Sequence, residues 1–365
     1  MKTSVTNILS SSSIAAIKKR MASFLANKHI NTIIPIYITQ SLDPKYVRER
    51  IDTPDGDFID LDWINKDVID KPTVILFHGF EGNSKSHYAR RLMYLIEQIG
   101  WRGVVFHYRG CSEEINRRPT FYHAGETEDI KFIINEIKLR SEKEIFAVGV
   151  SLGGNVLLKY LGEVINNPIT AAFVMSVPFN LDICIAHMDQ GVNKYLYVKH
   201  FLNSLLPKMK EYASMFDSFN YADHKKVDTL DEFNNTYVCQ FFDFKNSDDY
   251  YQQANCVPYL KQIKTPTMIL QSENDPMIPT SAWPEKEQLS QNIRFIATKT
   301  GGHAGFIALT TNLKDALLKL PKFIIEYFNQ YEGGGNDTRE NPAFAMDEFI
   351  NPEDTDYDDN GDKIA

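Results

Sequence analysis

Cysteine, tryptophan and long apolar runs are scarce in this chain of 365 residues, which has four cysteines and three tryptophans. The cysteines, at positions 111, 184, 239 and 256, have unrelated spacings that fit no disulfide framework. They predict free thiols in a reducing compartment, so we expect a cytoplasmic protein. Because no apolar stretch has the length that spans a bilayer and none has the form of a signal-peptide core, the sequence predicts neither a membrane anchor nor secretion.

The chain also lacks an excess of positive charge, since its formal net charge is −9. Residues 332–365 contain 11 acidic and 2 basic residues, a balance of −9, so the rest of the chain is close to neutral. This distribution predicts no nucleic-acid binding and a disordered acidic tail over 332–365. Residues 356–362 match the first half of a calcium-binding loop, but the chain ends before the glutamate that would complete it, so we predict no metal site.

A G-x-S-x-G pentapeptide at Gly149–Gly153 lies between an apolar run at 145–148 and a helix-like run at 155–161. A serine becomes available as a nucleophile when a sharp strand-to-helix turn lifts its hydroxyl from the backbone. Such a turn needs small residues on both sides. Ser151 is therefore the candidate nucleophile.

The order of residues along the chain selects the partners of Ser151, because in this arrangement a carboxylate and then a histidine follow the serine. Asp275 follows a strand candidate at 266–270 and is the only aspartate between Tyr250 and His303, with Glu273 as its one close rival. Of the nine histidines, only His303 comes after Asp275. The sequence predicts Ser151, His303 and Asp275 as nucleophile, base and orienting carboxylate.

The chemistry also requires two backbone N–H groups that bind the oxyanion, each worth about 3 kcal/mol in the transition state. Leu152, the residue after the nucleophile, supplies one of them. The strand candidate at 73–77 runs into a turn at His78, and the residue two positions later, Phe80, is the candidate for the second N–H. We expect His78 to shape this turn through hydrogen bonds.

Apolar segments of strand length alternate with segments of helix length through most of the chain, the pattern that builds a parallel sheet. The strand candidates are 73–77, 102–107, 144–150, 169–176, 266–271 and 293–298, and the helix candidates are 86–99, 126–140, 153–166 and 308–330. Residues 46–51 and 58–63 alternate with period two, which predicts an antiparallel hairpin before the parallel strands. The sequence predicts an α/β fold with a mostly parallel, doubly wound sheet.

Residues 180–255 interrupt this alternation and show helical apolar spacing. The residues that carry it are Tyr195, Val198, Phe201, Leu202 and Leu205 in one run and Met209, Tyr212, Ala213 and Phe216 in another. We expect a helical cap over Ser151, in which most aromatic side chains pack onto the body and a few line an apolar acyl pocket.

The other segments follow from these boundaries. Residues 1–25 form a basic amphipathic segment that we expect to pack on the body, and a weak peripheral contact with an anionic membrane is its second interpretation. Residues 26–331 are expected to form one hydrolase domain that includes the cap insert at about 180–255.

The sequence resembles the YheT-like family of α/β-hydrolases, which are bacterial proteins assigned as esterases with membrane-anchored lipases and esterases as animal relatives. The resemblance covers about residues 25–330 and includes the motifs Asn27–Pro35, Thr53–Trp63, His78–Gly82, Ser86–Arg90, His107–Cys111, Tyr122–Thr127, Gly149–Tyr160, Asp275–Pro276 and Gly301–Phe306. It implies an α/β-hydrolase fold with Ser151, Asp275 and His303 as the triad. Two residues depart from the family pattern: Val150 replaces a common aromatic, and Glu113 replaces an expected glycine.

Residues and resemblance together predict a carboxylic ester hydrolase that acts on short or medium acyl esters, acylglycerols included, through a Ser151 acyl-enzyme. Its partner is then a small-molecule ester or lipid, and it needs no cofactor. Two alternatives stay open: the same triad cleaving amides or thioesters, and a binding protein that keeps the fold without turnover. The sequence does not predict the oligomeric state.

Overall fold

The computed structural model describes residue 24, residues 26–217, residue 219, residues 227–308, residue 310 and residues 312–334. The predictions for the amphipathic segment at 1–25, for most of the acidic tail at 332–365 and for the calcium-like motif in that tail therefore lie outside the described residues, apart from residue 24 and residues 332–334.

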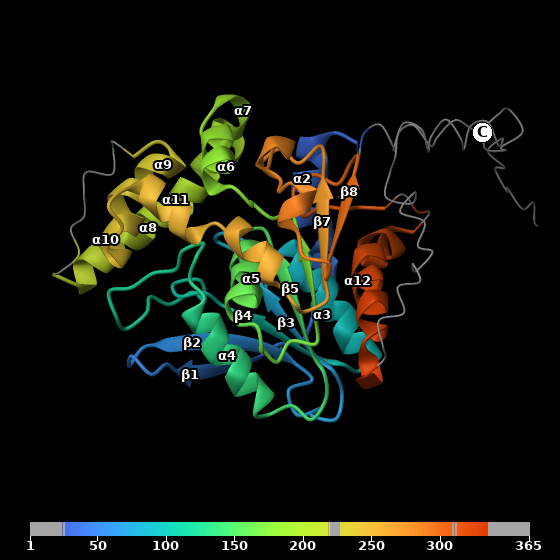
Figure 1. Cartoon of the computed structure of the whole chain (residues 1–365). Helices are drawn as coiled ribbons and strands as arrows, with labels where there is room; N and C mark the ends of the chain where they lie inside the picture. Colours follow the sequence, from blue (N-terminus) through green and yellow to red (C-terminus); the bar gives the residue numbers. More distant parts are fainter. Residues whose placement is uncertain are drawn as a thin grey trace, which may run out of the picture.

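One eight-stranded sheet forms the centre of the described chain, with the order β1-β2-β4-β3-β5-β6-β7-β8 (Figure 1). Its strands are β1 (Val47–Asp52), β2 (Phe58–Ile64), β3 (Thr73–Phe77), β4 (Arg102–Phe106), β5 (Ile145–Val150), β6 (Ala171–Met175), β7 (Thr267–Ser272) and β8 (Ile293–Thr298). β1 pairs with β2 and β2 with β4 in antiparallel fashion, and all other pairs are parallel. The predicted hairpin and mostly parallel sheet are confirmed.

Helices cover both faces of the sheet, because strands that are apolar on both sides need two covering layers. The helices of the body are α2 (Lys28–Ile38), α3 (His87–Ile99), α4 (Glu128–Lys138), α5 (Leu152–Glu163) and α12 (Leu313–Asn329). α3 and α12 pack on one face and α4 and α5 on the other, which divides the apolar core into two main clusters. None of the described helices combines the length and the hydropathy that crossing a bilayer requires.

A helical insert follows β6, as predicted. It consists of α6 (Leu181–Met188), α7 (Gly191–Asn193), η2 (Lys194–Val198), α8 (Lys199–Met215), α9 (Leu230–Phe233), η4 (Asn234–Val238), α10 (Cys239–Phe242) and α11 (Ser247–Ala254). Figure 1 shows these helices beyond the end of the sheet toward which β7 and β8 point. Short helical turns complete the description: η1 (Thr39–Ser41), η5 (Val257–Gln262), η6 (Thr280–Ala282), η7 (Lys286–Gln288) and η8 (Glu332–Gly334).

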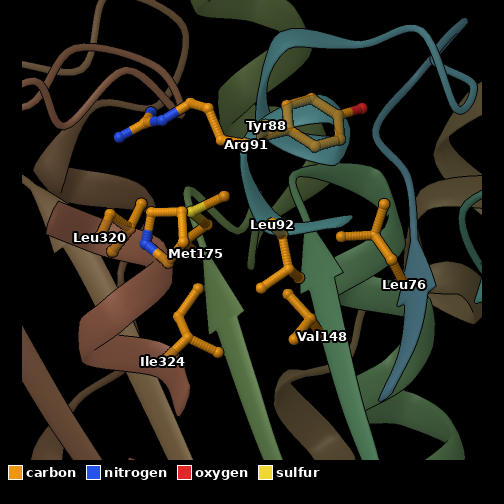
Figure 2. Close-up of a pocket in the computed structure, with 9 residues that line it drawn as sticks. Leu76, Tyr88, Arg91, Leu92, Val148, Met175, Leu320 and Ile324 are labelled. Atoms are coloured by element: carbon orange, nitrogen blue, oxygen red, sulfur yellow. The ribbon is translucent and has the colours of Figure 1, made fainter. Parts of the chain in front are cut away.

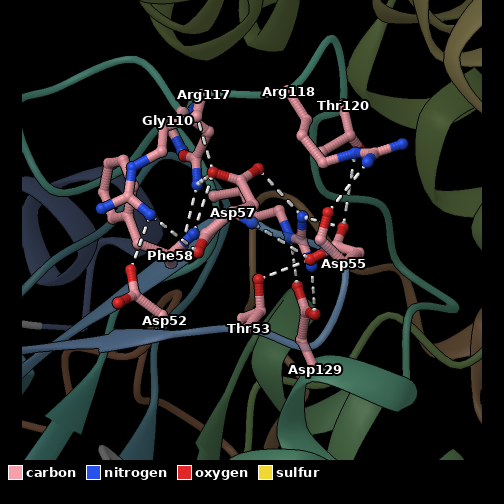
Figure 3. Close-up of polar contacts among 12 residues, drawn as sticks. Asp52, Thr53, Asp55, Asp57, Phe58, Gly110, Arg117, Arg118, Thr120 and Asp129 are labelled. Atoms are coloured by element: carbon pink, nitrogen blue, oxygen red, sulfur yellow. Dashed lines mark hydrogen bonds and ion pairs between the residues drawn. The ribbon is translucent and has the colours of Figure 1, made fainter.

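Arg109, which follows β4, ties the β1–β2 hairpin to helix α4 through Asp55, Asp57 and Asp129, which are labelled in Figure 3. Its guanidinium donates to both oxygens of Asp129 at 2.7 Å and to Asp55 and Asp57 at 2.9 Å. A hollow of about 390 Å³ beside Arg109 is lined by hairpin residues and by residues at the start of α4. Because none of the predicted triad residues lines it, this hollow is separate from the chemistry predicted above.

Glu113, which stands where the family resemblance implies glycine, has a φ of 77°. This left-handed conformation carries a steric cost for residues with a Cβ atom and is free of it in glycine. The backbone conformation at Glu113 therefore explains why the family resemblance implies glycine at this position.

Candidate active site

Ser151 lies at the junction of β5 and α5, in a backbone conformation with φ 54° and ψ −122°. Glycines on both sides make this turn possible. A Cβ atom on Gly153 would lie 2.3 Å from the Phe77 carbonyl oxygen, and one on Gly149 would lie 2.7 Å from the Cα of Gly154. The spacing of the pentapeptide thus has a steric reason, and it holds the Ser151 hydroxyl at the end of β5.

The structure brings the three residues of the predicted triad together in one chain of hydrogen bonds. The Ser151 Oγ lies 3.0 Å from the Nε2 atom of His303, whose Nδ1 atom lies 2.9 Å from the Asp275 Oδ2. The other carboxylate oxygen of Asp275 accepts the backbone N–H groups of residues 277 and 278 at 2.8 and 3.1 Å. Glu273, the rival carboxylate, is exposed to solvent. This geometry suits transfer of the hydroxyl proton to Nε2.

Contacts from distant segments hold the loop that carries His303. The His303 amide donates to the Thr32 hydroxyl of α2 at 2.9 Å, and the Ala304 amide donates to the Ser176 hydroxyl at 2.9 Å. The Asn274 side-chain oxygen accepts two amides of the same loop, from Gly301 and Gly302, each at 3.0 Å. The imidazole is therefore oriented by its backbone as well as by Asp275.

Arg91 of α3 also supports the loop that carries His303. Its guanidinium is buried and donates to the carbonyl oxygens of Gly305 and Phe306 at 2.6 and 3.2 Å. Figure 2 shows Arg91 at a small cavity between α3, α12 and the sheet. The cavity measures about 10 Å³, which leaves room for at most one water molecule, so it is a packing gap and not a ligand site.

The turn after β3 lies against Ser151, because a Cβ atom on Gly79 would come within 3.1 Å of the Ser151 Cβ. The Gly79 amide donates to the Tyr88 hydroxyl and the Glu81 amide to the Tyr122 hydroxyl, both at 2.9 Å. Among the described residues, nothing accepts a hydrogen bond from the amides of Phe80 or Leu152, the two predicted oxyanion donors. Both N–H groups therefore have no protein acceptor within the described part of the chain.

His78 shapes this turn in the way the sequence suggests. Its Nδ1 donates to the Gly79 carbonyl oxygen at 2.7 Å, and its Nε2 accepts the Tyr108 amide at 3.3 Å. Burial lowers the pKa of His78 to about 3, which keeps the ring neutral, as this pair of hydrogen bonds requires.

The Cys111 thiol is also buried, and burial raises its pKa to about 12, so it stays protonated and is a poor nucleophile.

Several residues that support the site were not predicted from the sequence. Thr32, Tyr88, Tyr122 and Glu81 lie in the motifs that carry the family resemblance, yet nothing in their local pattern indicates a role. Thr32, Tyr122 and Glu81 each contact a segment at least 41 residues away, and Tyr88 contacts a turn nine residues before it. These contacts arise from the packing of whole elements, which no local sequence pattern records.

Comparisons with known proteins identify the family and the fold of the chain. The family model described as alpha/beta hydrolase fold matches residues 72–308, which include all five predicted site residues. YheT of Escherichia coli (strain K12) is 34% identical over 292 residues, covering 78% of this chain and 86% of the relative. Phospholipase ABHD3 of Homo sapiens is 32% identical over 287 residues, covering 76% and 70%, and monoacylglycerol lipase of Saccharomyces cerevisiae is 27% identical over 246 residues, covering 65% and 55%.

Solved structures show the same fold at low sequence identity. The esterase Pf2001 of Pyrococcus furiosus superposes with a TM-score of 0.52 and 17% identity, covering 80% of this chain and 96% of that chain. Alpha/beta hydrolase domain-containing protein 10 from mouse has a TM-score of 0.50 at 13% identity, covering 78% and 99%. At these identities the likeness concerns the arrangement of sheet and helices alone.

Proposed function

The chain belongs to the α/β-hydrolase family and is a carboxylic ester hydrolase, and we propose that it cleaves short or medium acyl esters through a Ser151 acyl-enzyme. The observation that carries the proposal is the continuous hydrogen-bonded chain from the Ser151 Oγ through His303 to Asp275. A serine hydroxyl needs such a base, because it is a weak nucleophile at neutral pH.

In the first half of the proposed reaction, the Ser151 Oγ attacks the ester carbonyl carbon while its proton passes to the Nε2 atom of His303. Asp275 stabilises the imidazolium that forms and keeps the ring in the correct tautomer. The amides of Phe80 and Leu152 donate to the oxyanion, and the lack of an acceptor for them among the described residues supports this assignment. When the tetrahedral intermediate collapses, the alcohol leaves with the proton from His303.

In the second half, a water molecule attacks the acyl carbon and gives its proton to His303. The new intermediate collapses to the free carboxylic acid, and the proton returns to the Ser151 oxygen. All the steps use the residues of this chain with ester and water, so the proposed cycle balances without a cofactor.

The names of two relatives, a phospholipase and a monoacylglycerol lipase, support esters of glycerol lipids as the substrate class. The turn after β3, residues 78–82, carries the proposed oxyanion donor Phe80, and we call it the oxyanion turn. The rings of Phe80 and Phe201 have centroids 5.2 Å apart and provide an apolar surface suited to an acyl chain. The four buried free cysteines support a reducing compartment, and we retain the cytoplasm as the proposed location.

Labelling of the purified full chain with a fluorophosphonate tests the nucleophile without knowledge of the substrate. We expect wild-type protein to be labelled on the peptide that contains Ser151 and the Ser151→Ala variant to remain unlabelled. Ser214→Ala is the matched control, because Ser214 is exposed on α8 and its hydroxyl donates only to a carbonyl of its own helix. Folded wild-type protein that stays unlabelled would contradict an activated serine.

A panel of esters graded by acyl length then tests the substrate class, with the amide and thioester of the preferred acyl group in parallel. We expect the highest kcat/KM on esters of short or medium acyl chains, monoacylglycerols among them. A higher kcat/KM on the thioester or the amide would move the conclusion to one of those activities of the same triad.

A further inference from the structure

A polar cluster around a buried carboxylate lies one residue beyond Phe80 and joins the oxyanion turn to the cap. We call it the Glu81 cluster, and it consists of Glu81, Tyr122, Ser204 and Lys208. The Glu81 side chain is only 5% exposed, and its carboxylate accepts the Tyr122 hydroxyl at 3.0 Å and the Lys208 ammonium at 2.8 Å. The Ser204 hydroxyl donates to the same carboxylate. Every strong donor to this buried charge thus comes from outside the turn.

The backbone of Glu81 is strained, with a φ of 55°. A residue other than glycine persists in this conformation only where its surroundings hold it. The Tyr122 hydroxyl bridges the Glu81 amide and the Glu81 carboxylate, and the Gly82 amide closes the turn on the Gly79 carbonyl oxygen at 2.9 Å. The turn is therefore fixed on both sides of Phe80, while the Phe80 amide has no acceptor among the described residues.

One face of the cap helix α8 supplies the remaining support. Phe201, Ser204 and Lys208 are spaced by three and four residues, so they lie on the same side of the helix. Phe201 packs edge-on against the Phe80 ring at 5.2 Å between centroids, and the other two residues bind the Glu81 carboxylate. The cap thus holds the side chains of both residues at the centre of the turn.

We propose that Glu81 and Lys208 are positioning residues that aim the Phe80 amide at the oxyanion, so that the cap must be docked on the turn for full catalysis. This inference rests on the proposed function of Ser151. Loss of the ion pair frees the strained turn to relax, which changes the direction of the Phe80 N–H while leaving Ser151, His303 and Asp275 in place. The effect then falls on the transition state and not on the binding of the ester.

The test compares Glu81→Gln, Lys208→Met and the double variant with wild-type protein, using a chromogenic ester and a reversible alkyl trifluoromethyl ketone. The ketone forms a hemiketal with Ser151, and its oxyanion occupies the same position as that of the substrate. We expect kcat and the affinity for the ketone to fall together by about 10- to 100-fold, while KM changes by less than about twofold. The double variant should lose about as much kcat and ketone affinity as either single variant, because the two residues act as one unit.

Two controls keep the test decisive. Lys210→Met removes an exposed lysine of the same helix and should leave kcat and ketone affinity unchanged. The double variant leaves no unpaired charge in the cluster, so it should fold even where Lys208→Met does not, and circular dichroism checks this. A folded double variant with wild-type kcat, or one that loses kcat without losing ketone affinity, would overturn the positioning role. Because wild-type protein is labelled at Ser151 in either case, such a result leaves the proposed function intact, whereas unlabelled wild type would remove both.

Discussion

Ser151 and its glycine neighbours show how one residue's conformation depends on its surroundings. A non-glycine residue with a φ of 54° carries a strain of about 1–3 kcal/mol, which the packing around it must balance. Gly149 and Gly153 permit that packing, since a Cβ atom at either position would overlap backbone atoms. The strain is stored at the residue whose hydroxyl the proposed chemistry uses.

At the same scale, the proposed orienting carboxylate Asp275 can be distinguished experimentally from its rival, Glu273. We predict that Asp275→Asn lowers kcat by about 10⁴-fold. The asparagine oxygen can still accept the two amides that now bind Asp275, but its NH₂ group then faces the Nδ1 of His303 and favours the wrong tautomer. Steady-state hydrolysis of a chromogenic ester measures the change.

Glu273→Gln is the matched control, because it removes the charge of an exposed carboxylate two residues away. We expect it to keep wild-type kcat. A loss in Glu273→Gln equal to that in Asp275→Asn would mean that charge near the imidazole matters more than the tautomer.

At the scale of elements, a side chain of helix α3 replaces a backbone hydrogen bond that is missing in helix α12. Pro321 lies inside α12 and has no N–H, so the Leu317 carbonyl lacks its usual donor one turn later. The Nε of Arg91 donates to this carbonyl at 2.6 Å, while the rest of the guanidinium holds the loop after His303. The Arg91 side chain thus supplies the missing donor to a carbonyl of α12 and also supports the loop that carries the proposed catalytic base.

We predict that Arg91→Met lowers the free energy of unfolding by about 2 kcal/mol, because it leaves buried carbonyl groups without donors. In that background Pro321→Ala should cost about 1 kcal/mol less than it does in wild-type protein, since the new amide can donate to the freed Leu317 carbonyl. Urea unfolding of the four proteins measures both values. Additive effects of the two substitutions would contradict the link.

Arg90→Met tests whether any arginine of α3 has this effect. Arg90 donates to the carbonyl oxygens of residues 85 and 42 and lies nearer the surface. We expect Arg90→Met to lower the free energy of unfolding by less than Arg91→Met does.

At the scale of the molecule, the packed interior holds buried histidines whose protonation would lower the stability of the folded state. His78 lies under the oxyanion turn, and His123 packs against the rings of Phe242, Phe244 and Tyr250 between body and cap. Burial lowers the pKa of each to about 3, from 6.5 in the unfolded chain. Between these values the unfolded state binds protons that the folded state excludes, so acid favours unfolding.

Burial lowers the pKa of His87 to about 3 as well. We therefore predict that stability is full above about pH 6.5 and falls as the pH drops toward 3, by about 1.4 kcal/mol per pH unit for each of the three histidines. Urea unfolding at several pH values below neutrality gives the slope. His123→Asn removes one titrating ring and keeps an oxygen that can accept the Gly125 amide, now bound by the ring at 3.1 Å. An unchanged slope in this variant would show that His123 is not a buried neutral group.

Local patterns were sufficient to predict the strands, the hairpin and the nucleophile turn. Each of these depends on residues close together in the chain: apolar periodicity for the strands and small residues around Ser151 for the turn. The choice of Asp275 and His303 needed only their order along the chain, and the structure brings both to Ser151. Periodicity alone was less reliable in the cap, where Tyr195 shares the apolar spacing yet is 66% exposed.

The sequence by itself thus determined the α/β architecture, the helical insert after β6 and the candidate triad, because these follow from short-range pattern and order. Only the tertiary structure decided what holds the site in shape. Arg91 and the Gly305 carbonyl are 214 residues apart, and Glu81 and Lys208 are 127 residues apart. A buried charge finds its partner through the packing of whole elements, and no local propensity records which distant element will arrive there.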